Sequence, residues 1–195
     1  GLAAGAFASV DKINPVTGET ETYYYNYVGT DDSWTTASNW DPEGTPDIAT
    51  DAGAYNSAVV DGATVTCESE LDGWNIRLGA YNGAAVTLSK LTKMQCDTDQ
   101  WITVDASSSF TVNDWGGGYI GQNGQARTMA ISVASANGLT FAADLSSTYA
   151  DYGLTFNYNL AGAGSVSYQA LGIASHVIKQ ADIVLLSDAR KVTVQ

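Results

Sequence analysis

Aromatic rings and hydrogen-bonding side chains lie together in two loop-like segments of this chain. Sugar-binding proteins use this combination, because an indole ring stacks on the apolar face of a pyranose while amides and carboxylates bond to its hydroxyls. The candidate ligand-binding residues are Trp34, Asn39, Trp40, Asn113, Asp114 and Trp115. The alternative interpretation is that all these tryptophans are structural.

Carboxylates are a second source of chemistry, because the chain has 21 acidic residues. An aspartic peptidase needs two carboxylates that share a proton, usually within Asp-Thr-Gly or Asp-Ser-Gly. The nearest match is Asp51-Ala52-Gly53, which lacks the hydroxyl that would hydrogen-bond the pair. We therefore assign no catalytic residue, and Asp51 is the alternative if the protein is a peptidase.

Metal and cofactor sites receive little support. Calcium takes oxygen ligands, but the acid-rich loop has no EF-hand spacing, so a solvated turn is the simpler interpretation. The acidic residues of that loop are Asp31, Asp32, Asp41, Glu43, Asp47 and Asp51. With His176 as the single histidine, a histidine-rich metal site is excluded. The run 116–121 matches G-x-G-x-x-G, but no helix is expected after it, so a turn is favoured over a dinucleotide loop. The prediction is no cofactor and no assigned metal, with calcium as the alternative.

The bulk composition describes an acidic, weakly charged chain. Of 195 residues, 45% are hydrophobic and 15% are charged, and the net charge is −13. This balance argues against nucleic acid and anionic membranes as partners. No segment approaches the roughly 20 apolar residues of a membrane-spanning helix. We expect an extracellular glycan or glycoprotein as the partner, and the oligomeric state stays open.

Alternating apolar residues around Gly/Ser/Ala turns predict strands rather than helices. Four such strand–turn–strand units begin at Ile76, Ile102, Tyr119 and Tyr158. With one more unit near 139–141, the repeat is about 20 residues per coil. The predicted fold is all-β, an irregular right-handed β-solenoid, with an antiparallel β-sandwich or jelly roll as the alternative. At most one short helix is expected, near residues 171–181.

The N-terminal region and the two cysteines complete the organisation. Ala6-Phe7-Ala8 has the form of a signal-peptidase site, so residues 1–8 are a signal-peptide remnant or a tag-derived segment. Residues 9–195 are expected to form a single β-rich domain. The alternative is that this domain is truncated at its C-terminus. Residues 11–30 are expected to form a hairpin, with Tyr23, Tyr25 and Tyr27 on one face. Cys67 and Cys96 are expected to form a disulfide worth about 3–4 kcal/mol, or else to be buried thiols.

One segment has a recognisable order of tryptophans, turns and strands. It runs through Ser33-Trp34, Trp40, Thr45-Pro46-Asp47, Asp51-Ala52, Val59-Val60 and Val65-Thr66. Over roughly residues 33–131 this order resembles secreted bacterial surface proteins of the autotransporter-passenger kind, as encoded by mucin-degrading gut bacteria. The resemblance implies an exported, β-helical protein and carries no catalytic residues.

These observations lead to one hypothesis and two alternatives. The leading hypothesis is a secreted or cell-surface, non-enzymatic module that binds extracellular glycans such as mucin. The alternatives are a secreted aspartic-type peptidase acting on mucin-like glycoprotein, and a structural spacer.

Overall fold

The computed structural model describes residues 9–46, 57–96, 98–121, 126–146 and 154–171, together with two short strands at 184–185 and 191–194. Residues 1–8 and Asp51 lie outside this description. Of the predicted helix at 171–181, only Leu171 is described, and it ends a strand.

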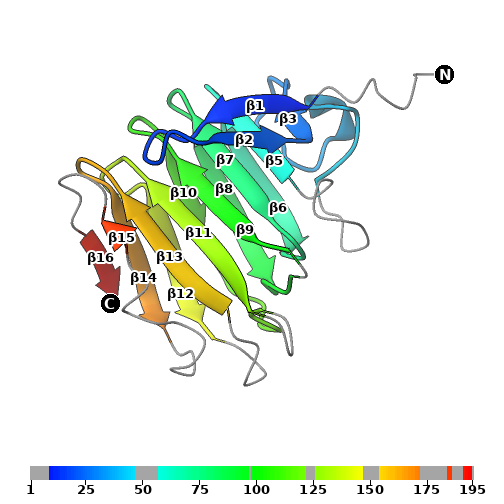
Figure 1. Ribbon diagram of the computed structural model, residues 1–195. Coiled ribbons are helices and arrows are strands. Elements are labelled where there is room, and N and C mark those ends of the chain that lie inside the picture. The colour runs from blue at the N-terminus through cyan, green and yellow to red at the C-terminus, as the bar shows by residue number, and fades with distance from the viewer. Residues whose placement is uncertain are drawn as a thin grey trace.

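Two large sheets make up the body of the fold, beside a two-stranded sheet at the N-terminus, and from β5 onward consecutive strands alternate between the two large sheets (Figure 1). The eight-stranded sheet contains β3 (Tyr25–Tyr27), β4 (Trp40–Asp41), β5 (Ser57–Asp61), β7 (Arg77–Tyr81), β9 (Gln100–Val104), β11 (Arg127–Val133), β13 (Leu154–Leu160) and β15 (Val184–Leu185). The six-stranded sheet contains β6 (Thr64–Asp72), β8 (Ala85–Thr92), β10 (Ser109–Val112), β12 (Leu139–Leu145), β14 (Ser165–Leu171) and β16 (Lys191–Val194). The described residues contain no α-helix, only a 3-10 turn at Ala37–Asn39.

Apart from β4, which is antiparallel to β3, the strands in both sheets pair in parallel. The chain therefore stacks coil upon coil, and each full coil contributes one strand to each sheet. This all-β, solenoid-like stacking overturns the antiparallel β-sandwich or jelly roll, because antiparallel neighbours would dominate those folds.

The backbone register gives the length of each coil. Ala58, Leu78, Ile102, Ile131 and Tyr158 occupy one position on successive coils, so the repeats are 20, 24, 29 and 27 residues long. Three of the four predicted strand–turn–strand units are confirmed, as β7–β8, β9–β10 and β13–β14.

The predicted unit that begins at Tyr119 is wrong. Ile120 forms an isolated bridge with Met94 in the connection between β10 and β11, and β11 is followed by β12.

The backbones of neighbouring coils also touch where the strands of the six-stranded sheet end, as shown by the 2.7 Å hydrogen bond from Gly73 N to the Thr92 carbonyl. A Cβ on Gly73 would lie 1.9 Å from the Lys93 carbonyl oxygen, so this position requires glycine.

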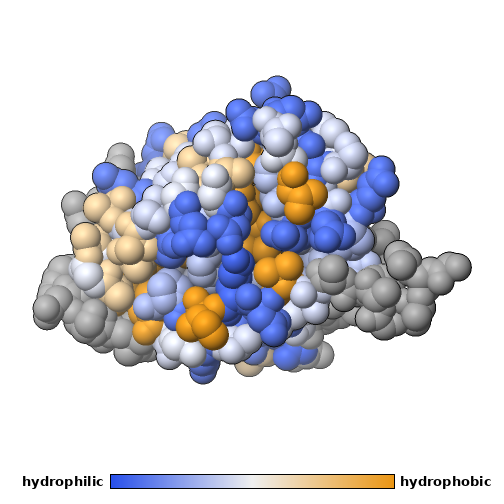
Figure 2. All heavy atoms as spheres, turned by 90° about the horizontal axis from the view of Figure 1, so that it is seen from above, coloured by the Kyte–Doolittle hydropathy of each residue, from blue (hydrophilic) through white to orange (hydrophobic). Residues whose placement is uncertain are grey.

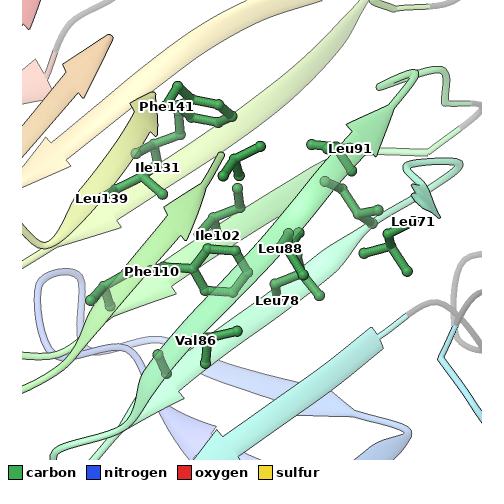
Figure 3. Packing of buried hydrophobic residues seen from close by; sticks show 14 of the residues in the cluster. Leu71, Leu78, Val86, Leu88, Leu91, Ile102, Phe110, Ile131, Leu139 and Phe141 are labelled. Atoms are coloured by element: carbon green, nitrogen blue, oxygen red, sulfur yellow. The ribbon is translucent and has the colours of Figure 1, made fainter. Parts of the chain in front are cut away.

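The hydrophobic core lies between the two sheets (Figure 3). Along each strand every second side chain points inward, as in Leu78 of β7, Leu88 of β8 and Ile102 of β9. Leu88 and Ile102 are fully buried. Their close packing in successive coils makes burial of apolar area the main stabilising contribution of the fold.

The predicted disulfide between Cys67 and Cys96 is absent. Both cysteines are buried in the core, where they pack as small apolar side chains. Cys67 pairs in register with Leu88 of the next coil, and Cys96 lies eight residues further along that coil, past the end of β8. The two cysteines therefore lie on successive coils and at different positions around the coil.

An antiparallel hairpin of β1 (Val10–Ile13) and β2 (Thr20–Tyr23) confirms the start of the predicted hairpin. We call residues 10–23 the strap, because they cross the outer face of the eight-stranded sheet (Figure 1). Tyr23 packs on that outer face, whereas Tyr25 and Tyr27 are in the core. The predicted common face is wrong, because the chain bends at Tyr24 between β2 and β3.

The face of the molecule seen from above mixes hydrophilic and apolar side chains (Figure 2). In the view from above, apolar side chains form small groups between hydrophilic ones (Figure 2). Among the described residues, the exposed large hydrophobic side chains are Ile13 and Val28. No helix in the described part of the chain has the length and hydropathy that a membrane crossing needs.

Candidate functional site

Trp34, Asn39 and Trp40 close the N-terminal end of the core. The side chains of Trp34 and Trp40 are 1% and 2% exposed, and their ring centroids lie 4.8 Å apart in an edge-on arrangement. Their indole N–H groups donate to backbone carbonyls, Trp34 to Pro46 at 3.2 Å and Trp40 to Trp34 at 2.7 Å.

Asn39 is also buried and donates a 2.8 Å hydrogen bond to the Ser33 carbonyl. Burial corrects the prediction for these three residues: neither indole face is available to a sugar ring. Their role is to cap the stack of coils.

The second predicted group lies at the surface. Asn113 and Asp114 are exposed directly after β10, and Asp114 forms an ion pair of 3.6 Å with Lys90. Trp115 is half-buried against the core, and its indole N–H donates a 2.6 Å hydrogen bond to the Ser146 carbonyl. This bond holds the ring at the margin of the six-stranded sheet. Asn113, Asp114 and Trp115 remain candidates for ligand binding.

A row of hydroxyl side chains runs across the six-stranded sheet, one on each coil. We call it the hydroxyl ladder; its members are Ser33, Thr66, Thr87, Thr111, Thr140 and Ser167. Each pairs in register with the next, and the backbone register continues to Thr193 on β16. Adjacent members are therefore about 4.8 Å apart, the distance between hydrogen-bonded strands.

The ladder faces outward because its neighbours along each strand face inward. On β8 Thr87 lies between Val86 and Leu88, and both of these side chains are buried in the core. The ladder side chains are all half-exposed. Alternation along a strand thus places the hydroxyls on the outer face.

Beyond the first two rungs, Ser33 and Thr66, the residues that flank the ladder are small or polar. On β8, β10, β12 and β14, or directly after them, they are Ala85, Ser89, Ser109, Asn113, Ala142, Ser165 and Gln169. Within this strip of described residues no side chain is charged, although the protein as a whole carries a net charge of −13. Charged groups begin at its margin, with Lys90, Asp114 and Asp144, and with Glu68 beside Thr66 on β6.

An acidic groove of about 300 Å³ lies at the N-terminal end of the ladder. Its lining residues are Asp31, Asp32, Ser33, Thr35, Thr66 and Glu68, of which Ser33 and Thr66 belong to the ladder. No group of three or more His, Cys, Asp or Glu side chains in the described ranges is placed to hold a metal ion. The calcium alternative gains no support from these residues, and Asp47 and Asp51 of the acid-rich loop lie outside them.

Glu21 is a half-buried acid that could be mistaken for a catalytic residue. Desolvation by burial raises its pKa, the kind of shift that accompanies acid–base catalysis. However, Glu21 belongs to the strap, and its two carboxylate oxygens accept hydrogen bonds from Thr103 at 2.7 Å and Asn14 at 3.2 Å. Its position and partners indicate a structural role.

The ladder was missed in the sequence, although a signal is present. In each of five strands a Thr or Ser stands between two core residues: Val-Thr-Cys, Val-Thr-Leu, Phe-Thr-Val, Leu-Thr-Phe and Val-Ser-Tyr. Aligning these triplets would have revealed the row, but their spacing varies from coil to coil.

Comparison with known proteins adds no further assignment: no protein-family model matches the chain, and no curated protein or solved structure gives a significant match.

Proposed function

We propose that this protein is an exported, non-enzymatic module that binds extracellular glycans, and that the outer face of the six-stranded sheet is its binding surface. The hydroxyl ladder carries the proposal. We also infer that the stack is an irregular right-handed β-solenoid, because connections between parallel strands of one sheet are right-handed in nearly all proteins.

The chemistry of the face suits sugars. Threonine and serine hydroxyls both donate and accept hydrogen bonds, as sugar hydroxyls do. The half-buried ring of Trp115 lies at the margin of this face, beside the exposed amide of Asn113. Aromatic and polar groups are what the sequence analysis expected of a sugar-binding site. The buried Trp34 and Trp40 cannot supply the aromatic part, and Trp115 is the ring proposed in their place.

The export of the protein and its bacterial surface location rest on the sequence alone. The acidic, weakly charged composition and the resemblance of residues 33–131 to autotransporter-passenger proteins support both. Mucin is the proposed glycoprotein partner on the same grounds. The peptidase alternative depends on Asp51, outside the described residues, and no described feature favours it.

A glycan array tests the proposal. The purified protein should bind at least one class of extracellular glycan, with mucin O-glycans included on the array. In Thr111→Tyr, a ring stands in the middle of the ladder, and binding should fall by about tenfold or more, equivalent to about 1.4 kcal/mol. Tyrosine suits a strand, so the fold should be retained.

Thr155→Tyr is the matched control. Thr155 is also a half-exposed strand threonine, but it lies on the outer face of the eight-stranded sheet. This variant should bind as the wild type does. The proposal fails if the wild-type protein binds no glycan, or if both tyrosine variants lose binding equally.

A further inference from the structure

We propose that the ligand is an uncharged, linear polysaccharide that lies along the hydroxyl ladder, across the strands, with about one sugar unit per coil. This inference rests on the proposed function and names the class of glycan and its direction on the sheet.

The direction follows from the register. The ladder repeats its chemistry along the stacking direction, from Ser33, which precedes the first full coil, to Ser167 on the fifth full coil. Five steps of about 4.8 Å give a row of about 24 Å. A ligand can use the whole row only if it also repeats along its length, as a linear polysaccharide does. An extended hexose unit is about as long as the spacing between two strands, so successive units can meet successive hydroxyls.

The shape of the strip allows a chain to lie flat on it. The flanking side chains Ala85, Ser109 and Ala142 are short, and no aromatic ring rises from the strip between Thr87 and Ser167. A polymer that crosses β8, β10 and β12 therefore meets no side chain large enough to interrupt its contacts with the hydroxyls.

The charge distribution selects an uncharged polymer. The strip itself carries no charge, and the acidic groove with Asp31, Asp32 and Glu68 lies at one end of the ladder. A polyanion would be repelled by this groove and by the net charge of −13. A polycation would gain attraction at the groove and none along the strip. A neutral hexose or N-acetylhexosamine polymer matches the strip over its full length.

Oligosaccharides of increasing length test the inference. Cello-, manno- and chito-oligosaccharides, from disaccharide to octasaccharide, would be titrated into the protein by calorimetry. For the series that binds, affinity should rise with each added unit until the ligand spans the ladder, and then level off.

Valine variants test the hydroxyls without changing side-chain shape. Thr87→Val, Thr111→Val and Thr140→Val should each weaken binding of the longest oligosaccharide by about two- to tenfold, the range expected for one net hydrogen bond. The disaccharide should be affected less by each variant, because it touches fewer rungs. Thr155→Val, on the other sheet, should change neither affinity.

The outcomes separate this inference from the proposed function. If glycans bind but the disaccharide binds as tightly as the octasaccharide, or if the three valine variants change nothing, the linear mode is overturned and glycan binding stands. Stronger binding of a polyanion such as hyaluronan would also overturn it. Absence of any glycan binding would overturn the proposed function itself.

Discussion

The hydroxyl of Thr103 on β9 donates a 2.7 Å hydrogen bond to the carboxylate of Glu21 on β2, 82 residues earlier in the chain. Asn14 extends the connection, since its amide donates to Glu21 at 3.2 Å and to Ser132 on β11 at 3.0 Å. These hydrogen bonds hold the strap to two successive coils. The strap in turn covers the polar side chains of Thr103 and Ser132 to which it is bonded.

The first prediction concerns the pH dependence of stability. Burial raises the pKa of Glu21 above its ordinary value of 4.5, so the folded state binds its proton more readily than the unfolded state does. The contribution of this group to the free energy of unfolding is therefore greatest below pH 4.5 and is lost as pH rises through the folded-state pKa.

Glu21→Gln removes this titration. Denaturant unfolding measured between pH 4 and pH 7 should show a smaller decline with rising pH in Glu21→Gln than in the wild type (about pH 4.5 marks the start of the window). Identical slopes for the two proteins would show that Glu21 does not titrate differently on folding.

The second prediction concerns the attachment of the strap. Asn14 is buried and its side chain bonds to Ser132, Glu21 and two backbone N–H groups of its own turn. Asn14→Ala should destabilise the protein by about 1–3 kcal/mol, because buried partners lose their hydrogen bonds. Hydrogen exchange should show the greatest loss of protection in β1 and β2.

Thr22→Val provides the control for Asn14→Ala. Thr22 lies on the same hairpin, and its hydroxyl bonds to Asp11 at the exposed side. Its substitution should change stability by less than about 0.5 kcal/mol. Equal losses of protection in the two variants would contradict the anchoring role of Asn14.

The third prediction concerns the contact between Tyr23 and Gly79. A Cβ at Gly79 would lie 2.6 Å from the Tyr23 hydroxyl oxygen and 2.9 Å from a ring carbon of Tyr81. Gly79→Ala should therefore destabilise the protein by about 1–3 kcal/mol through overpacking.

A double-mutant cycle tests the contribution of the hydroxyl, since the Tyr23 ring carbon that bears it would lie 2.7 Å from the same Cβ. Tyr23→Phe removes the hydroxyl and the 3.1 Å hydrogen bond that it accepts from the Trp101 indole N–H, so it is destabilising alone. In the background of Tyr23→Phe, Gly79→Ala should be less destabilising than in the wild type. Strict additivity of the two free-energy changes would mean that the hydroxyl adds nothing to the clash made by the ring carbons of Tyr23 and Tyr81.

The fourth prediction separates structural from exposed tryptophans. Trp40→Ala should reduce the free energy of unfolding by about 3–5 kcal/mol, because the ring is fully buried in the cap. Trp115→Ala should destabilise less and should weaken glycan binding, since this ring is half-buried at the margin of the proposed surface. The assignment is contradicted if Trp115→Ala retains wild-type affinity on the array that tests Thr111→Tyr.

Much of the fold was predictable from local pattern. Alternation around short turns correctly predicted β7–β8, β9–β10 and β13–β14, because a period of two is imposed by the pleat of a single strand. The segment at Tyr119 shows the limit of this reasoning. Its apolar pair belongs to a connection that touches Met94 of the preceding coil, and nothing in the local pattern distinguishes that contact from a strand.

The candidate site was less predictable for a related reason. Trp34 and Trp40 stand among turn-forming polar residues, which favoured exposure, yet they fold inward to cover the end of the core. The Asn113–Trp115 segment has a similar composition and lies at the surface. Composition alone cannot distinguish them, because burial depends on whether an open end of the core lies within reach.

The sequence by itself determined that this chain forms strands, that it is acidic, and that its single histidine excludes a histidine-rich metal site. The tertiary structure decided the parallel pairing, the separation of Cys67 from Cys96, and the alignment of Thr66, Thr87 and Thr111 into one row. The physical reason is the range of the interactions involved. Alternation is a property of one strand, whereas register is set by turns and core packing between coils that are 20 to 29 residues apart.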